Sequence, residues 1–216
     1  MRGDSIVIED HHRKAAAGIA PLVRKSLNDP DARIGVTIAG ESGSGKSEIA
    51  AALAEALAAD GVNCVIFGQD DYFVYPPKSN DAARRKDITW VGPQEVKLDL
   101  MDQHMRAFID GATAIEKPEV VYEDDVVDRE VLDTTGARVA IAEGTYTTLI
   151  TAARHHAFID RDYTQTRKHR EKRNRDASEL DVFIDRVLEI EHAIISAHKA
   201  QADIVINADY SVSPNG

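Results

Sequence analysis

The chain has 216 residues, 43% of them apolar, which is enough to form one domain around a single substantial core. Its 26 Lys and Arg residues against 37 Asp and Glu residues give a formal net charge of −11. This charge argues against the basic surface of a protein that binds nucleic acid or anionic lipid. The sequence also lacks a signal peptide pattern and any run of about 18 apolar residues. We therefore expect a cytoplasmic protein with small-molecule partners, and the sequence leaves open whether it forms a homodimer.

Helical and strand-like patterns alternate along the chain. The spacing of apolar residues predicts an amphipathic helix over residues 11–27, and the turn-rich residues 76–87 are expected to form an exposed loop. Strands that recur between helices predict an α/β sandwich with a mostly parallel sheet. The expected core strands are 34–39, 62–67, 138–142, 157–160 and 202–207. The later expected helices are 47–59, 93–111, 163–176 and 179–199, and a β-hairpin is expected over about 118–132.

A glycine-rich segment follows the first predicted strand. Residues 40–47 read Gly-Glu-Ser-Gly-Ser-Gly-Lys-Ser and match the pattern G-x-x-x-x-G-K-[ST], with a helix directly after them. Glycines let consecutive backbone N–H groups point at phosphate oxygens, and the helix N-terminus adds partial positive charge. Lys46 is expected to reach the β- and γ-phosphates, and Ser47 to bind Mg²⁺. The predicted nucleotide-binding residues of this loop are Gly40, Ser42, Gly43, Ser44, Gly45, Lys46 and Ser47.

Carboxylates at two strand ends favour a kinase among the nucleotide-binding classes. The sequence has no Asn-Lys-x-Asp guanine reader, which argues against a GTPase, and no signature of an ATPase motor or transporter subunit. A kinase needs a carboxylate near the acceptor hydroxyl to take its proton. Asp70 and Asp71 follow the second strand, and we favour Asp70, with Asp71 as the alternative. Glu143 ends the third core strand, where a carboxylate can hold the metal through water.

A basic segment follows the fourth core strand. Six of the nine residues 167–175 are Lys or Arg, in an otherwise acidic chain. Arg167, Arg170 and Arg173 repeat every three residues, so on a helix they share one face. We expect this segment to form a lid over about 163–176 whose arginines stabilise the polyphosphate. A solvated basic helix and an RNA-binding arm are the alternatives.

Together these motifs resemble the uridine kinase, phosphoribulokinase and nicotinamide riboside kinase family of P-loop proteins, over roughly residues 34–207. The resemblance rests on the phosphate loop, on Gln69-Asp-Asp-Tyr-Phe73, on Pro118 with Tyr122 and Arg129, and on Glu143-Gly144. It implies a three-layer, nucleoside-kinase-like P-loop NTPase fold whose five-stranded, mostly parallel sheet has the order 2-3-1-4-5. It also implies ATP and Mg²⁺ as cofactors and a helical, arginine-rich lid.

The resemblance also implies roles for individual residues. Asp70 would accept the proton and take part in Mg²⁺ binding, Glu143 would support the metal, and Arg175 would join the lid arginines at the nucleotide. The expected substrate-binding residues are Asp71, Tyr72, Tyr122 and Arg129.

The acceptor side differs from that of uridine kinases. They carry Asp-His-Pro where this chain has Val91-Gly92-Pro93, and a histidine between the positions of Tyr122 and Arg129, where this chain has acidic residues and valines. The acceptor therefore stays open among nucleosides, sugars and related metabolites. Two charged clusters are either solvated or in contact with a charged acceptor: Arg84-Arg85-Lys86 with an anion, and Glu123-Asp124-Asp125 with a cation. The alternatives to a metabolic kinase are an ATP-binding regulator without turnover and a zeta-toxin-like sugar-nucleotide kinase.

Overall fold

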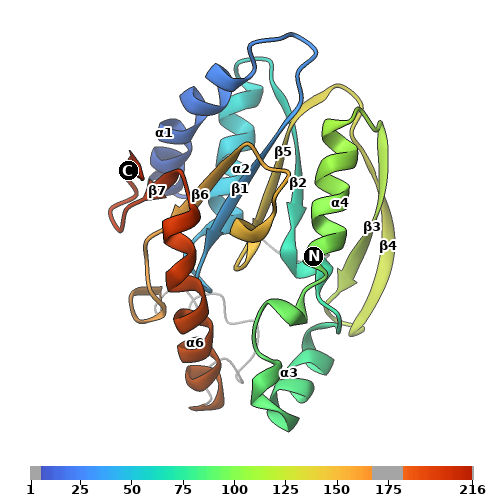
Figure 1. Cartoon of the computed structure of the whole chain (residues 1–216), viewed down its shortest axis with the longest axis vertical. Coiled ribbons are helices and arrows are strands. Elements are labelled where there is room, and N and C mark those ends of the chain that lie inside the picture. Colours follow the sequence, from blue (N-terminus) through green and yellow to red (C-terminus); the bar gives the residue numbers. More distant parts are fainter. Residues whose placement is uncertain (1–5, 167–181, 216) are drawn as a thin grey trace.

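The chain folds into three layers, with helices on both faces of a central sheet (Figure 1). The computed structural model describes residues 6–166 and 182–215. Within these residues, no helix is both long enough and apolar enough to span a bilayer. The helices are α1 Asp10–Ser26, α2 Lys46–Ala58, α3 Pro77–Lys86, α4 Leu98–Ile109 and α6 Val182–Ile195. The strands are β1 Ile34–Gly40, β2 Asn63–Gly68, β3 Ala114–Val121, β4 Val126–Asp133, β5 Ala137–Gly144, β6 His155–Ile159, β7 Ile204–Ile206 and β8 Val212–Pro214.

Over the described residues, the central sheet has six strands in the order β2-β5-β1-β6-β7-β8. The first five in this order run parallel, and β8 pairs antiparallel with β7 at the edge. The expectation of five strands is thus corrected to six, because the polar tail after residue 207 turns back and forms β8. Strand β1 lies between β5 and β6, so groups at the carboxyl ends of β5 and β2 lie on one side of the phosphate loop, and those of β6 and β7 on the other.

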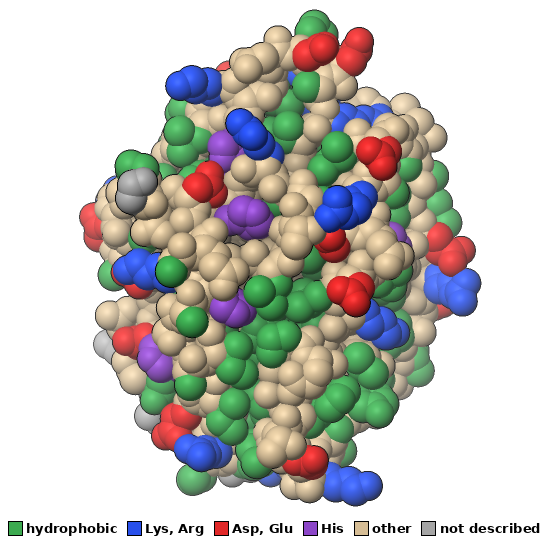
Figure 2. Space-filling model, in the orientation of Figure 1, with side chains coloured by type: hydrophobic (Ala, Val, Ile, Leu, Met, Phe, Trp, Pro, Cys, Tyr) green, Lys and Arg blue, Asp and Glu red, His purple; other side chains and the backbone are tan. Residues whose placement is uncertain are grey.

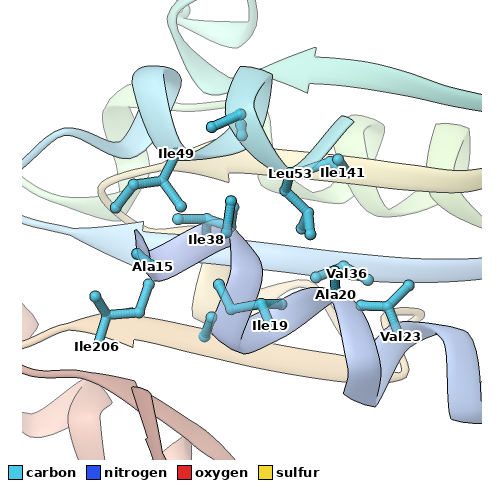
Figure 3. Close-up of a cluster of buried hydrophobic side chains, with 14 of the residues drawn as sticks. Ala15, Ile19, Ala20, Val23, Val36, Ile38, Ile49, Leu53, Ile141 and Ile206 are labelled. Carbon is cyan, nitrogen blue, oxygen red and sulfur yellow. The ribbon is translucent and has the colours of Figure 1, made fainter. Parts of the chain in front are cut away.

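Two apolar cores hold the layers together. On one face, α1 and α2 pack against the sheet, and Figure 3 shows Ile19 and Val23 of α1 meeting Val36 and Ile38 of β1. On the other face, α4 supplies Met101, Met105 and Phe108, and α6 supplies Ile195. The labelled residues in Figure 3 are wholly or almost wholly buried. This double burial explains why the core strands read as nearly continuous apolar runs.

The predicted loop at residues 76–87 is wrong, because most of it forms helix α3. Pro77 occupies the first turn, where proline is tolerated and pre-set for a helix. The helix has little apolar surface to bury, and it docks through polar side chains instead: Asn80 and Arg84 both donate to Glu95 at 2.6 Å. Arg84 is therefore largely buried and ion-paired, not solvated in a loop.

The helix expected from Pro93 is interrupted at its start. A 3₁₀ turn occupies Pro93–Glu95, and the regular helix α4 begins only at Leu98.

In the view of Figure 2, apolar side chains gather between α6 and α3, and most charged side chains lie around the edge of that area.

The β-hairpin expected over about 118–132 is formed by the antiparallel strands β3 and β4, which extend over residues 114–133. It is a separate two-stranded sheet that contacts α4 and the 3₁₀ helix Gln69–Tyr72. Most of the expected lid lies outside the described residues, including Arg167, Arg170, Arg173 and Arg175.

Candidate active site

The phosphate loop joins the end of β1 to the start of α2. Gly43 and Gly45 have φ angles of 73° and 96°, which are left-handed values that favour glycine. The Nζ of Lys46 lies over the loop and donates to the backbone oxygen of Glu41 at 2.9 Å. The Ser44 hydroxyl is fully buried and has no partner among the described residues. A phosphate oxygen in the loop would supply such a partner, so the loop fits a nucleotide phosphate.

Two contacts fix the start of this loop. The Glu41 carboxylate pairs with Nδ1 of His192 on α6 at 2.6 Å, and Thr166 donates to the backbone oxygen of Ser42 at 2.8 Å. Burial raises the pKa of Glu41, and the His192 contact opposes that shift. The chain entering the predicted lid therefore touches the phosphate loop at residue 166.

Two of the predicted carboxylates and the loop serine border one cavity of about 280 Å³ at the strand ends. Asp70 follows β2, Glu143 lies in β5, and Ser47 lies in the first turn of α2. The pKa of Glu143 is raised to about 7, first by burial and then by Asp70, against the opposing effects of Lys46 and Ser47. Mg²⁺ prefers oxygen ligands and is commonly held by one or two carboxylates together with substrate phosphates. These three side chains therefore fit the metal that ATP would carry.

The neighbouring Asp71 has both carboxylate oxygens engaged within the protein. Its Oδ2 accepts from Lys117 Nζ at 3.0 Å, and its Oδ1 accepts from the backbone N–H of Val120 at 3.0 Å. Lys117 also pairs with Glu130 at 2.9 Å. Burial alone would lower the pKa of Lys117, but Glu130 and Asp71 outweigh it and raise the value. Asp71 lines the cavity, and its contacts tie the β3–β4 hairpin to the end of β2.

The other residues predicted to bind the acceptor do not line this cavity. Tyr72 is fully buried, and its hydroxyl pairs with Nδ1 of His104 at 2.9 Å. Arg129 has a 79% exposed side chain and pairs with Glu116 on the same hairpin. Tyr122 lies at the turn of the hairpin, with the Lys78 ammonium 5.9 Å from its ring centre. Their roles toward an acceptor stay predictions.

The structure adds two residues that the sequence did not single out, Lys117 and Glu130 of the hairpin, which line the cavity. It also shows that Gln69, at the start of the predicted motif, accepts from the backbone N–H of Tyr146 at 2.7 Å. A Cβ on Gly144 would lie 2.2 Å from the Cβ of Gln69. Only glycine at residue 144 therefore allows the end of β5 to lie this close to Gln69, the residue before Asp70. The lysine directly before Pro118 was the available signal for the first pair, because a charged residue in a strand of a hairpin needs a partner if it is buried.

Known proteins resemble this chain in both sequence and fold. Residues 34–208 match the model of the "Phosphoribulokinase / Uridine kinase family". The bifunctional alpha-galactosidase/sucrose kinase AgaSK of Mediterraneibacter gnavus is 29% identical over 192 residues, covering 83% of this chain. The match spans only 20% of that longer protein.

Solved structures share the fold at low identity. A possible uridine kinase from Bacillus stearothermophilus has a TM-score of 0.59 at 18% identity, covering 89% of this chain and 97% of that one. The phosphoribulokinase from Rhodobacter spheroides has a TM-score of 0.58 at 12% identity, covering 83% of this chain and 71% of that one. With the family model matching most of its length, the chain belongs to the phosphoribulokinase/uridine kinase family.

Proposed function

We propose that this protein transfers a phosphoryl group from ATP, with Mg²⁺, to a hydroxyl group of a small metabolite. One observation carries the proposal: Ser47 of the phosphate loop, Asp70 and Glu143 border the same cavity. Nucleotide binding alone would require only the loop. A carboxylate beside the loop supplies the group that a hydroxyl acceptor needs and that a simple ATP sensor does not.

The position of each residue determines its proposed role in phosphate binding or in proton transfer. The backbone N–H groups of the loop and Lys46 bind and orient the phosphates, while Asp70 accepts the proton of the acceptor hydroxyl. Asp70 is exposed to the cavity, whereas Glu143 lies deeper, beside Ser47. The bound Mg²⁺ would neutralise charge on the transferring phosphoryl group. The lid arginines are proposed to add to this stabilisation.

Sugars are the first acceptors that we propose to test, and nucleosides the second. The relative from M. gnavus is named for a sucrose kinase activity. Val91-Gly92-Pro93 makes a turn ahead of α4 in which Val91 and Gly92 are buried, without the acid and histidine that uridine kinases carry there. We propose that it acts in the cytoplasm.

A coupled assay of ADP release over sugars and nucleosides tests the proposal. Asp70→Asn should lower turnover by about 10²- to 10⁴-fold while ATP binding persists. Lys46→Ala should lower turnover and also weaken ATP binding. The matched controls are Asp128→Asn and Lys25→Ala, which change exposed residues on β4 and α1. Wild-type turnover in both site variants, or no acceptor-dependent ADP release from the wild type, would refute the proposal.

A further inference from the structure

The segment ahead of α1 contributes a side chain to the cavity at the strand ends. Ile6 lines this cavity together with Ser47 and Asp70. In the chain it precedes the first core strand by the whole of helix α1. The family model matches residues 34–208, so Ile6 lies outside the matched part of the chain. This side of the cavity is therefore built by residues that the family match does not include.

Helix α1 holds this segment beside the phosphate loop. The backbone N–H of Glu9 donates to Nδ1 of His12 at 3.1 Å, which closes the first turn of α1. His12 is buried, and a Cβ on Gly45 would lie 3.0 Å from its Nε2, so this first turn lies directly against the loop. Ile8 packs against the core that α1 and α2 cover. The contacts of residues 8–12 therefore fix the direction in which the chain reaches the cavity at Ile6.

The apolar surface of Ile6 is not used by either core of the protein. Ile6 shares the lining of the cavity with two other aliphatic side chains, Ile66 of β2 and Leu132 of β4. Ile66 packs against one core and Leu132 against the other, whereas Ile6 joins neither within the described residues. Ile6 is 47% exposed, and the next residue, Val7, is 67% exposed but does not line the cavity. The surface of Ile6 is thus open to a ligand in the cavity.

The lining of the cavity has two chemical parts. Ser47, Asp70 and Glu143 are the polar groups that fit the metal and the reacting hydroxyl, and the three aliphatic side chains are the apolar part. Small-molecule sites commonly combine a few placed polar groups with apolar surface. A hydroxyl group on a metabolite is attached to carbon, and the C–H surface around it is bound more favourably against apolar side chains than in water. The aliphatic part of the lining fits that surface.

We propose that Ile6 is an acceptor-contacting residue, which forms with Ile66 and Leu132 the apolar side of the acceptor site. The carbon-bound surface of the acceptor rests on these side chains while its hydroxyl meets Asp70. The inference rests on the proposed function and adds to it a contact from outside the matched family region. The ligand is a compact polyhydroxylated metabolite, and both free sugars and the ribose of nucleosides have this chemistry.

The first test compares Ile6→Ala with Val7→Ala in the coupled ADP-release assay. The acceptors are sucrose, D-fructose, D-ribose, uridine and cytidine, so the sugar and nucleoside arms are separate. Covering a whole isoleucine side chain is worth roughly 10- to 100-fold in affinity, and about half of Ile6 is already covered. Ile6→Ala should therefore raise the KM of the best acceptor by about fivefold, while kcat and the KM of ATP change less than twofold. Val7→Ala should leave all three within about twofold.

Melting temperatures separate this role from a structural one. Ile6 is half exposed and lies outside both cores, so Ile6→Ala should lower the melting temperature by less than about 2 °C. A side chain that only packs against the fold would lower the melting temperature and leave the acceptor KM unchanged. An unchanged acceptor KM in Ile6→Ala, or an equal rise in Val7→Ala, would overturn the inference while the kinase activity itself stands.

A second test needs no known acceptor. The single cysteine of the chain, Cys64, is replaced by alanine, and Ile6→Cys or Val7→Cys is introduced into that background. Because Ile6 shares its cavity with Ser47 and Glu143, bound MgATP should slow the reaction of Ile6→Cys with Ellman's reagent about fivefold, and that of Val7→Cys less than twofold. Equal rates with and without MgATP would overturn the placement of Ile6. If the wild type releases no ADP with any acceptor, the proposed kinase activity is refuted, and the thiol rates alone decide whether Ile6 borders the ligand site.

Discussion

Replacing Asp71 should destabilise the protein far more than replacing its neighbour Asp70. Asp71 and Lys117 each have a 5% exposed side chain, and the two form an ion pair at 3.0 Å. Asp71 also accepts from the backbone N–H of Val120 at 3.0 Å. Asp71→Ala would leave the Lys117 ammonium buried with Glu130, whose side chain is 41% exposed, and would leave the Val120 N–H without its partner.

The size of the effect follows from these contacts. Breaking a buried ion pair by removing one member costs about 3–5 kcal/mol, and the lower end applies because Glu130 still faces Lys117. We therefore expect Asp71→Ala to lower the free energy of unfolding by about 3 kcal/mol. Asp71→Asn keeps an oxygen for the Val120 N–H and should cost about 1–2 kcal/mol.

Urea denaturation of the single and double variants checks this reasoning. In Asp71→Asn combined with Lys117→Met, both charges are gone and the Val120 bond remains, so stability should recover relative to Asp71→Ala. Asp70→Asn, at an exposed position, should change stability by less than about 0.5 kcal/mol. A loss below about 1 kcal/mol for Asp71→Ala, or a double variant no more stable than it, would refute the structural role of the pair.

Three further changes test the loop and the strand ends. Gly144→Ala places a Cβ 2.2 Å from that of Gln69, so it should cost about 2 kcal/mol in urea denaturation and lower turnover by displacing Asp70. Gly45→Ala puts a side chain on a residue with φ of 96°, and calorimetry should show ATP binding at least about tenfold weaker. Burial and Asp70 raise the pKa of Glu143 from 4.5 to about 7, so the folded protein holds a proton that the unfolded chain releases between these values. Stability should therefore fall as pH rises from 4.5 through 7, by up to about 3 kcal/mol, and Glu143→Gln should flatten this slope in urea titrations at pH 5 and 8. An equally steep slope in Glu143→Gln would assign the effect to another group.

The sequence was sufficient for the core strands and the phosphate loop because their signals are local. A buried parallel strand reads as a short apolar run, and the loop needs its glycines, Lys46 and Ser47 within eight consecutive positions. Neither signal depends on what the distant chain does. The same holds for α1, whose apolar spacing predicted nearly its full extent.

The errors occurred where polar contacts between distant segments decide the structure. Helix α3 looked like a loop because two prolines, Pro76 and Pro77, stand at its start and it has few apolar residues, yet Asn80 and Arg84 dock it onto a buried glutamate. The edge strand β8 was missed for a similar reason. It is a short strand, residues 212–214, in a polar tail, and it forms only because β7 offers an unpaired edge.

The polar contacts around the phosphate loop are harder to predict than the loop itself, because their groups come from many elements. Arg84 comes from α3, Tyr146 from the turn after β5, Glu191 from α6 and Lys117 from β3. Each of these residues is unremarkable in its local sequence, and each becomes informative only through a partner, or the lack of one, far along the chain. A family can therefore keep its nucleotide loop while its acceptor changes through scattered polar substitutions.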